Sequence, residues 1–561
     1  SSMTQPALPV TLTLASGVER IFPTLTPAQV QRIAVHGQVR SIRAGEVLFE
    51  AGEHVVPFFV VTAGRLEIVL PSGTTERLVT VYGPGQFTGE VNMLSGRPVL
   101  TRSRASEAGE VIELDREHLV ALVQTDSEIG EIIMRAFITR RVELIAQGLG
   151  DVVVVGSNHC SGTLRVKEFL TRNSHPYTYI DLDRDADVQG LLDQFHVTAA
   201  DVPVVICRSD VVLRNPTIQQ IADCLGFNKP IDQTQIRDVV IVGAGPAGLA
   251  AAVYGASEGL DVLVLETNAP GGQAGSSSKI ENYLGFPTGI SGQDLAGRAY
   301  AQAQKFGAQM LITKGAKHLA CDRKPYTIGI DDSLRVPART IIIATGAAYR
   351  KPPIGNLSQF EGTGVYYAAT FMERQVCRAE EVVVVGGGNS AGQAAVFLAQ
   401  ASKRVHMLVR SSGLAETMSR YLIRRIEQNP AIVLSANSEI VALEGTHHLE
   451  RVSWHDHQSA STETHDIRHV FLMTGAVPNT QWLGGCVALD ADGFIKTGPD
   501  LSQEDLATAH WPLPRAPHLL ETCLPGVFAV GDVRSGNIKR VASAVGEGSI
   551  AVSFVHQALH E

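Results

Sequence analysis

The sequence predicts a multidomain protein: an N-terminal β-barrel with helices, then an α/β unit, then two larger α/β domains. Three observations predict this fold class. The chain has 561 residues, whereas one domain usually has roughly 100 to 200. Short strands separated by glycine-bearing turns occupy its first part. Farther on, two glycine-rich turns each follow a run of β-branched residues and precede a helix, which is typical of nucleotide-binding α/β domains.

The composition is that of an ordinary globular protein and excludes several classes. Hydrophobic residues make up 44% of the chain and charged residues 19%, which excludes disorder, collagen and coiled coil. The formal net charge is −10, so no basic field draws the chain to nucleic acid or to a membrane surface. No apolar run approaches the roughly 18 residues of a spanning helix. We therefore expect a soluble protein that acts on small molecules.

The seven cysteines are scattered along the chain. Their spacing fits neither a disulfide framework nor the paired ligands of a zinc site. We therefore expect no metal site, and the reducing cytoplasm is the compartment that fits best.

The first domain is expected at residues 1–148. Thr26 followed by Pro27 predicts a helix start, because a capping hydroxyl and a proline at the first helical position both favour one. Strands are expected at 46–49, 58–62, 65–70 and 77–82, and two helices within 116–147. This pattern predicts a small β-barrel with flanking helices.

The second unit is expected at residues 149–228. A buried strand at 152–156 precedes a helix at 164–170, a strand at 177–182 and a helix up to 195. This alternation predicts a βαβ arrangement. The polar segment 228–235 then predicts a linker.

The first glycine-rich turn follows a strand at 239–242 and opens a helix at 249–258. Its glycines allow a tight turn, close approach of the backbone to a pyrophosphate, and close helix–strand packing. Glu266, at the end of the next strand, is placed to bond an adenosine ribose. The alternative is an ordinary glycine-rich βα turn. The expected binding residues of the turn itself are Gly243, Gly245, Pro246, Ala247 and Gly248.

The second glycine-rich turn follows a strand at 382–385 and predicts the nicotinamide nucleotide site. Arg410, at the end of the next strand, favours NADPH over NADH because a guanidinium can bind a 2′-phosphate. NADH stays possible, and Arg410 could instead be a solvated surface charge. The expected binding residues of the turn are Gly386, Gly388, Asn389, Ser390 and Ala391.

Residues 236–561 resemble the low-molecular-weight thioredoxin reductase family of flavoproteins. The resemblance is carried, in the family's order, by Gly271-Gly272-Gln273, by 281–287, by Ala344-Thr345-Gly346 and by 526–532. It implies that the first turn binds FAD, that a helix near 542–557 points its N-terminus at the flavin, and that the protein is a homodimer. It also implies an FAD domain at 229–350 and 481–561 around an NAD(P)H-binding domain at 351–480. The further FAD contacts that it implies are Gly272, Gln273, Asn282, Thr345, Gly346 and Asp532.

The family carries a C-x-x-C pair shortly after a Gly-Val, where this chain has Ala368 and Phe371. Neither side chain can form a disulfide, so the usual flavin-to-dithiol relay cannot operate there. The second unit resembles a glutaredoxin-like or thioredoxin-like domain, with Cys160 before a helix and a Val-Pro at 202–203 where the family has a cis-proline. Thr163 stands where a resolving cysteine would be, so Cys160 is a candidate for monothiol catalysis only. The alternative is that Cys160 is a small apolar filler in a scaffold.

Residues 20–148 resemble a cyclic nucleotide-binding domain, through the segment 83–94. The resemblance implies that Gly89 and a following short helix bind a cyclic phosphate and that Glu90 binds the ribose. The family's phosphate-binding arginine after a proline is here Val99, after Pro98. Four alternatives stay open for this domain: it binds a cyclic nucleotide-like ligand, it binds a different ligand, its site is weakened, or it is a purely structural barrel.

The leading hypothesis is an FAD-dependent oxidoreductase that takes hydride from NAD(P)H and passes electrons to an unknown acceptor other than a local C-x-x-C. Two linkers, near residues 351 and 480, would allow domain rotation, and a ligand of the N-terminal domain would bias it. The alternatives are a disulfide reductase that uses Cys160 of the same or a neighbouring subunit, a ferredoxin or quinone reductase, and a flavin or nucleotide sensor without steady turnover.

Overall fold

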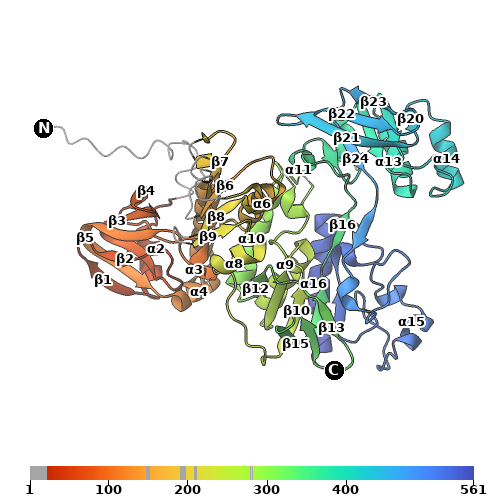
Figure 1. Ribbon diagram of the computed structural model, residues 1–561. Helices are drawn as coiled ribbons and strands as arrows, with labels where there is room; N and C mark the ends of the chain where they lie inside the picture. The colour runs from red at the N-terminus through yellow and green to blue at the C-terminus, as the bar shows by residue number, and fades with distance from the viewer. Residues whose placement is uncertain are drawn as a thin grey trace.

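The computed structural model describes residues 22–561, except 96, 147–151, 187, 190–191, 193–196, 208–210, 278, 281 and 370. Figure 1 shows a barrel at one end, a separate α/β lobe at the other, and two packed α/β parts between them. We call these the barrel domain (22–146), the second unit (152–227), the central domain (228–349 and 476–561) and the inserted domain (350–475). None of the helices in this described part is both long enough and apolar enough to span a membrane.

The barrel domain is a five-stranded antiparallel sheet of order β1-β5-β3-β4, in which β2 also pairs with β5. Thr26 caps α2 as expected, since its side chain accepts from the backbone N–H of Gln29. The two strands expected at 58–62 and 65–70 are one continuous strand, β3. The chain does not turn at Gly64 because Gly109 opposite it has no side chain, and a Cβ there would lie 1.9 Å from the carbonyl oxygen of Ala63. The elements are α2 (Pro27–Ala34), β1 (Gln38–Ile42), β2 (Val47–Phe49), β3 (Phe58–Ser72), β4 (Thr75–Tyr82), α3 (Val91–Ser95), β5 (Arg102–Leu114), α4 (Arg116–Thr125) and α5 (Ser127–Ala146).

The second unit is a four-stranded sheet of order β7-β6-β8-β9. Strands β6 and β7 are parallel, whereas β8 runs antiparallel to β6, and the Val202–Pro203 peptide bond before β8 is cis. The helix expected up to residue 195 falls partly outside the described residues. The elements are β6 (Val152–Gly156), α6 (Ser161–Arg172), β7 (Tyr177–Asp181), η1 (Ala199–Asp201), β8 (Val204–Cys207), β9 (Val211–Arg214) and α8 (Ile218–Cys224).

The central domain is built on a seven-stranded sheet of order β12-β11-β10-β15-β14-β13, with β26 paired to β15. Strands β12, β11, β10, β15 and β26 are parallel. Helices α9, α10 and α16 pack against one another, with α9 in contact with both of the others. The elements are β10 (Arg237–Val242), α9 (Pro246–Ser257), β11 (Val262–Glu266), η2 (Ala274–Ser276), α10 (Gly292–Lys305), β12 (Gln309–Ile312), β13 (His318–Ala320), β14 (Tyr326–Gly329), β15 (Arg335–Ile343), η3 (Gln481–Leu483), η4 (Gly498–Asp500), α15 (Gln503–Thr508), β26 (Val527–Ala529), η5 (Gly531–Val533) and α16 (Val541–Ala558).

The second unit and the central domain share one hydrophobic core. Phe169 and Leu170 of α6 belong to the same buried cluster as Ile241 of β10 and Ala303 of α10. The expected linker is also held in place, because the Asn228 side chain bonds both the carbonyl oxygen and the N–H of Ile312 at 2.7 Å. The two parts are therefore joined by buried apolar surface and not only by a linker.

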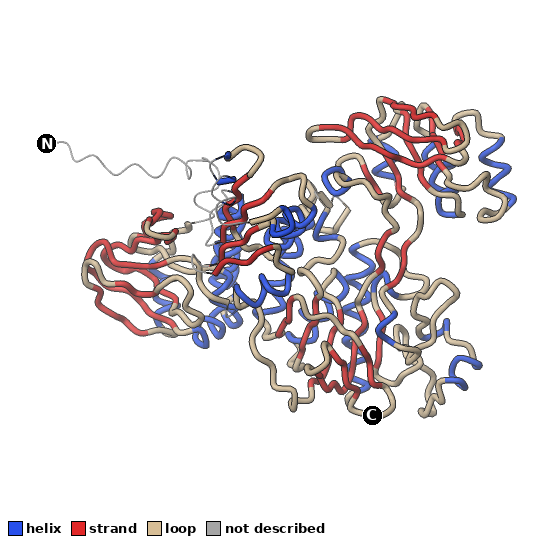
Figure 2. The backbone as a smooth tube through the Cα atoms, viewed as in Figure 1, coloured by secondary structure: helices blue, strands red, loops and turns tan. Residues whose placement is uncertain are grey.

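The inserted domain is connected to the central domain by two short strands, β16 (Ala347–Tyr349) and β25 (Ala476–Pro478), which pair antiparallel. Figure 2 shows these strands as the narrow neck below the separate lobe. The lobe contains a five-stranded parallel sheet of order β17-β24-β18-β19-β20 and a three-stranded antiparallel sheet. Its elements are α11 (Leu357–Phe360), β17 (Val365–Tyr366), α12 (Phe371–Val376), β18 (Glu381–Val385), α13 (Asn389–Ala399), β19 (Arg404–Leu408), α14 (Arg420–Glu427), β20 (Ile432–Ser435), β21 (Ser438–Gly445), β22 (Leu449–Asp456), β23 (Ser461–His465) and β24 (Val470–Leu472).

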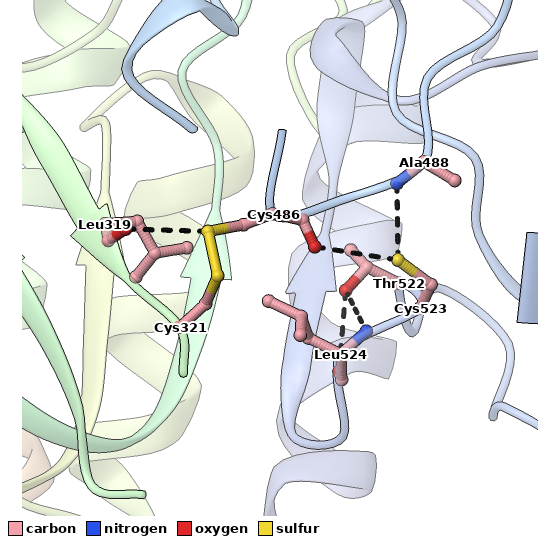
Figure 3. Close-up of a disulfide and its surroundings, with 7 residues drawn as sticks. All are labelled: Leu319, Cys321, Cys486, Ala488, Thr522, Cys523 and Leu524. Atoms are coloured by element: carbon pink, nitrogen blue, oxygen red, sulfur yellow. Dashed lines mark hydrogen bonds between the residues drawn. A yellow bond between two sulfur atoms is a disulfide. The ribbon is translucent and has the colours of Figure 1, made fainter. Parts of the chain in front are cut away.

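One disulfide corrects the expectation drawn from the cysteine spacing. Cys321 and Cys486 are 165 residues apart in the sequence but have Cα atoms 6.2 Å apart and are bonded (Figure 3). Cys523 lies beside them, with its thiol 3.7 Å from the carbonyl oxygen of Cys486. Sequence spacing missed this pair because the inserted domain separates two segments that the central domain brings together.

Candidate functional site

The first glycine-rich turn has no room for side chains and leaves a helix N-terminus open. Gly243 has φ +106°, and a Cβ on it would lie 2.2 Å from the carbonyl oxygen of Ala344. A Cβ on Gly248 would lie 1.8 Å from the carbonyl oxygen of Gly243. Gly245 is the N-cap of α9 and provides no side-chain cap. The first N–H groups of α9 are therefore available to an anion such as a phosphate.

Glu266 lies beside this turn, as expected. Its carboxylate is 8% exposed and accepts hydrogen bonds from the backbone N–H groups of Ala244 at 3.1 Å and Asn268 at 3.0 Å. Burial raises the pKa of the Glu266 carboxyl, and the bonds from Asn268 and Ala244 act in the opposite direction. A ribose hydroxyl at this place would find a fixed acceptor.

The segment that follows Glu266 returns to the same turn. The N–H of Gly271 bonds the carbonyl oxygen of Ala244 at 2.7 Å. A Cβ on Gly272 would lie 2.9 Å from the Cα of Gly245, so the two glycines are in close contact. The Gln273 side chain donates to the carbonyl oxygen of Ala347 in β16, and Asn282 is exposed.

Asp532 and its neighbours close the other end of the site. Asp532 is partly buried in η5, and burial raises the pKa of its carboxyl while Lys539 lowers it. Helix α16 begins nine positions later, at Val541, without a side-chain cap on its N-cap residue, Arg540. Thr345 donates to the carbonyl oxygen of Asn479 at 2.9 Å, and the N–H of Asn479 bonds Gly346 at 3.1 Å. Thr345 and Gly346, two of the predicted FAD contacts, therefore lie at the junction with the inserted domain.

The predicted FAD residues that the structure describes fit an extended dinucleotide. Glu266 ends β11 and the open N-terminus of α9 follows the neighbouring strand β10, both at the carboxyl edge of the parallel sheet, and a second open helix N-terminus begins α16, which packs on α9. Ligands of open α/β sheets bind at this edge. Among the predicted FAD residues, Asn282 is exposed, and we assign no contact to it.

The second glycine-rich turn repeats this geometry in the inserted domain. Gly386 has φ +139°, and a Cβ on it would lie 2.4 Å from the carbonyl oxygen of Met473. Gly388 caps α13 without a side chain and has no atom within 4 Å of its Cβ position. Ser390 is exposed and Ala391 is buried, while the Asn389 side chain accepts from the N–H of Ser419 at 2.8 Å.

Arg410 is available at the surface beside this turn. Its side chain is 84% exposed, and its Nε lies 3.5 Å from Glu439. Such an exposed pair is weak, so an incoming phosphate can replace the carboxylate.

The place of the family's cysteine pair is occupied by other residues. Ala368 is exposed, and Phe371 begins α12. Tyr367, directly before Ala368, stacks on Tyr349 of β16 with ring centroids 4.7 Å apart. Burial, and then the charge of Asp532, raise the pKa of Tyr349 to about 12. The sequence analysis missed this stacked pair, which crosses the junction between the two domains.

Cys160 is the N-cap residue of α6 and lies beside the cis-proline segment. Its thiol is 3.6 Å from the carbonyl oxygen of Val202. Partial burial raises the pKa of the Cys160 thiol, but hydrogen bonds from Thr163 and Gly162 outweigh it, so the pKa lies below its ordinary value. Cys207 is fully buried and Cys224 partly buried.

The N-terminal ligand residues lie in a tightly packed turn. A Cβ on Gly89 would lie 2.5 Å from the Phe137 ring. The buried Glu90 carboxylate accepts from the N–H of Leu100 at 2.8 Å. Arg140, which the sequence analysis did not single out, is 6% exposed and donates to the carbonyl oxygens of Gly89 and Phe87 at 2.8 and 3.0 Å.

Arg97, two positions before the buried Val99, points to the central domain. Its guanidinium lies 4.1 Å from the centroid of the Phe227 ring and donates to the Tyr300 hydroxyl at 3.1 Å. The barrel domain therefore contacts α10 through the same segment that would hold a cyclic phosphate. Only its position next to Pro98 distinguishes Arg97 in the sequence.

Comparisons with known proteins match two parts of the chain. The family model described as pyridine nucleotide-disulphide oxidoreductase matches residues 237–548, and that of the cyclic nucleotide-binding domain matches residues 39–126. The thioredoxin reductase of Mycoplasmopsis pulmonis (strain UAB CTIP) is 30% identical over 324 residues, which is 57% of this chain and 97% of that protein. The thioredoxin reductase of Treponema pallidum (strain Nichols) is 33% identical over 322 residues, 56% of this chain and 94% of that protein.

Among solved structures, thioredoxin reductase from Streptococcus pyogenes MGAS5005 is similar with a TM-score of 0.51 and 29% identity, over 58% of this chain and 98% of that one. The relatives thus match the central and inserted domains. The barrel domain has its own match, to the cyclic nucleotide-binding model.

Proposed function

The chain belongs to the thioredoxin reductase-like pyridine nucleotide-disulphide oxidoreductases, which are NAD(P)H-dependent flavin oxidoreductases, and from this premise we propose that it transfers electrons from NAD(P)H through FAD to an acceptor other than a local dithiol. The observation that carries the second part of the proposal is the pair Ala368 and Phe371 at the place of the C-x-x-C motif. Neither side chain can be reduced or oxidised as a disulfide.

FAD bound in the central domain would supply the two-electron chemistry, because a flavin accepts hydride and can return the electrons to a different acceptor. The chain's own groups bind and orient it. The open N-terminus of α9 would bind the diphosphate, Glu266 would accept from the ribose, and Asp532 would bind the ribityl chain. The N-terminus of α16 would stabilise negative charge on the reduced ring. Gly245, Gly272 and Gln273 line the same edge.

The inserted domain would hold the nicotinamide nucleotide. The open N-terminus of α13, with Gly388 and Ser390, would bind its diphosphate. Arg410 favours NADPH, because its guanidinium is exposed and can exchange Glu439 for a 2′-phosphate. NADH is the alternative, and it would bind without using Arg410.

The neck formed by β16 and β25 would let the inserted domain rotate. These two strands are short, whereas the Tyr349–Tyr367 stack across the neck supports one orientation. Rotation would bring the nicotinamide to the flavin and then free the flavin for its acceptor.

We propose that the second unit is a thioredoxin-like domain; a thiol at a helix N-terminus and a cis-proline beside it support this. We propose monothiol reactivity for Cys160, but its position argues against direct reduction by the flavin of the same subunit. Helix α6 has 12 residues and is therefore about 18 Å long. Its opposite end, at Arg172, contacts Gly272 beside the first glycine-rich turn, and the shared core holds this distance.

A ligand of the barrel domain is proposed to act on the reductase through Arg97. Helix α3, where a cyclic phosphate would bind, lies against α10, and α10 packs on α9. A ligand that moves α3 would thus shift a helix in contact with the flavin-binding helix. A ligand would regulate the enzyme by this route only if it binds one of two conformational states of the chain more tightly than the other.

An anaerobic absorbance titration tests the proposal. The flavin spectrum of the purified chain should bleach on addition of NADPH, and more NADH than NADPH should be needed. The Arg410→Gln variant should lose this preference, because it lacks the cation for the 2′-phosphate. Addition of thioredoxin, glutathione disulfide, a ferredoxin or a quinone should then reoxidise the flavin in one case. A flavin that neither nucleotide reduces would contradict the enzyme proposal and favour a sensor.

The Cys160→Ser variant separates the remaining acceptors. It should reduce its flavin as the wild type does. Loss of disulfide turnover in this variant would assign Cys160 as the acceptor, through a neighbouring subunit or a large rearrangement. Unchanged turnover with a quinone or ferredoxin would exclude the thiol from the electron path.

A further inference from the structure

The C-terminal end of α6, in the second unit, is bonded to the segment of the central domain that packs on the first glycine-rich turn. Arg172 Nη2 donates to the carbonyl oxygen of Gly272 at 2.5 Å. Asn173 Nδ2 donates to the carbonyl oxygen of Asn268 at 3.2 Å, and Gln293 Nε2 to that of Thr171 at 2.6 Å. Two hydrogen bonds thus fix this helix end on the segment that returns from Glu266 to the turn, and a third fixes it on α10.

The Arg172 guanidinium has N–H donors that the described hydrogen bonds do not use. Its Nε is buried and has no hydrogen-bond partner among the described residues. A guanidinium carries five N–H donors, and the described contacts use one of its nitrogens. A buried N–H group of a charged side chain costs free energy when it has no hydrogen-bond partner. We therefore expect an acceptor beside Arg172 Nε.

The surroundings of Arg172 indicate an anionic acceptor. Gly272, which it contacts, packs on Gly245 at the uncapped N-terminus of α9. A Cβ on Gly275 would lie 3.2 Å from Arg172 Nη2, so the glycine leaves room for the guanidinium. The charge of Arg172 also reaches Glu266, where it lowers the pKa of a carboxyl that burial raises. A cation and a positive helix end therefore face the same small region.

We propose that Arg172 binds the diphosphate of the dinucleotide held by the central domain, so that the second unit completes the FAD site. The inference rests on the proposed function, since FAD is the dinucleotide concerned. The bond to Gly272 orients the guanidinium, and its free N–H groups donate to phosphate oxygens in the paired geometry that guanidinium and phosphate favour. The second unit is then a structural part of the flavin site.

Variants of Arg172 in the full-length chain test this role. Arg172→Gln keeps a donor for the carbonyl of Gly272 but removes the charge. Arg172→Lys keeps the charge but lacks the paired, coplanar N–H donors of a guanidinium. Arg184→Gln is the matched control, because Arg184 lies in the same unit with its side chain 89% exposed. Calorimetry on the apoprotein measures the Kd of FAD and, separately, of ADP, which has the diphosphate but no flavin.

Arg172→Gln should weaken both FAD and ADP by about tenfold to a hundredfold, as loss of a charge-assisted hydrogen bond predicts. Arg172→Lys should fall between this variant and the wild type, Arg184→Gln should match the wild type, and added salt should weaken the wild type more than Arg172→Gln. If Arg172→Gln does not fold, the Arg172→Lys Kd decides, and an unchanged value overturns the inference.

Two outcomes separate this inference from the proposed function. A wild-type chain that binds FAD and ADP, with both Kd values unchanged in Arg172→Gln, overturns the role of Arg172 alone. A wild-type apoprotein that binds neither ligand overturns the proposed function, and the inference with it.

Discussion

Two cysteines of this chain differ in acidity because their surroundings differ. Cys160 stands at a helix N-terminus and receives hydrogen bonds from Thr163 and Gly162, which bring its pKa below the ordinary value despite partial burial. Cys377 is fully buried, and burial, followed by the charges of Glu380 and Glu373, raises its pKa to about 12. Of these two, Cys160 is the one that combines access with a stabilised thiolate.

Alkylation of the native protein should modify Cys160 first. Since its pKa is lowered, the rate should rise with pH along a curve whose midpoint lies below that of an ordinary cysteine. Cys377 should react only after denaturation. Iodoacetamide labelling followed by peptide mass spectrometry measures both rates, with Cys160→Ser as the control. Faster labelling of Cys377 in the folded chain would contradict this assignment.

Gly248→Ala should abolish FAD uptake and destabilise the central domain by about 3 kcal/mol or more, because the added Cβ meets a backbone oxygen at 1.8 Å. Gly297→Ala is the matched control: that glycine lies within α10 and has nothing within 4 Å of its Cβ position. It should be neutral or stabilise by up to about 1 kcal/mol. Urea unfolding and flavin content measure the two effects, and equal stabilities for the two variants would show the prediction to be wrong.

At the element scale, α10 connects three parts of the molecule. It receives Arg97 and Gln124 from the barrel domain and bonds the second unit through Gln293. It also packs on α9, at whose N-terminus the FAD diphosphate is expected. One helix therefore contacts the barrel domain, the second unit and α9.

Arg97→Ala should loosen the barrel domain from the rest of the chain. The variant loses the contact with the Phe227 ring and the bond to Tyr300, which together are worth about 1 to 3 kcal/mol. Hydrogen exchange in α10 should become faster, and calorimetric unfolding should separate into two transitions. Arg65→Ala controls for charge, because Arg65 is 55% exposed in an ion pair with Glu107. Exchange rates in α10 equal to those of the wild type would exclude this coupling.

At the scale of the whole molecule, the disulfide and the neck have different roles. The neck strands β16 and β25 are where the inserted domain would rotate. Cys321 and Cys486 both belong to the central domain, so the bond joins its two segments and leaves the neck free. The chain can therefore be rigid across its central sheet and still be mobile at the inserted domain.

Replacement of both Cys321 and Cys486 by serine should lower the free energy of unfolding of the central domain by about 2 to 5 kcal/mol, since the bond closes a loop of 165 residues. Flavin reduction by NADPH should be unchanged, because the bond does not cross the neck. Urea midpoints with and without dithiothreitol measure the effect. The reductant should destabilise the wild type and not the double variant, and a wild type insensitive to it would contradict the structural role.

The sequence by itself determined the order of the parts and most of their elements. Helix α2 with its Thr26 cap, strand β10 before Gly243 and strand β18 before Gly386 were all expected, because strands, turns and caps are set by neighbouring residues. The families of the central and inserted domains and of the barrel domain were expected from the resemblance of sequence motifs to known families, and the family models match them.

The tertiary structure alone decided which distant residues meet. The Cys321–Cys486 bond, the contact of Arg97 with Phe227, the Tyr349–Tyr367 stack and the contact of Arg172 with Gly272 each join segments that have no local relation in the sequence. The continuous strand β3 was missed for the same reason, since a glycine opposite Gly64 turns an expected loop into a bulge. Packing across domains, which no local pattern encodes, therefore decides how the N-terminal parts reach the flavin site.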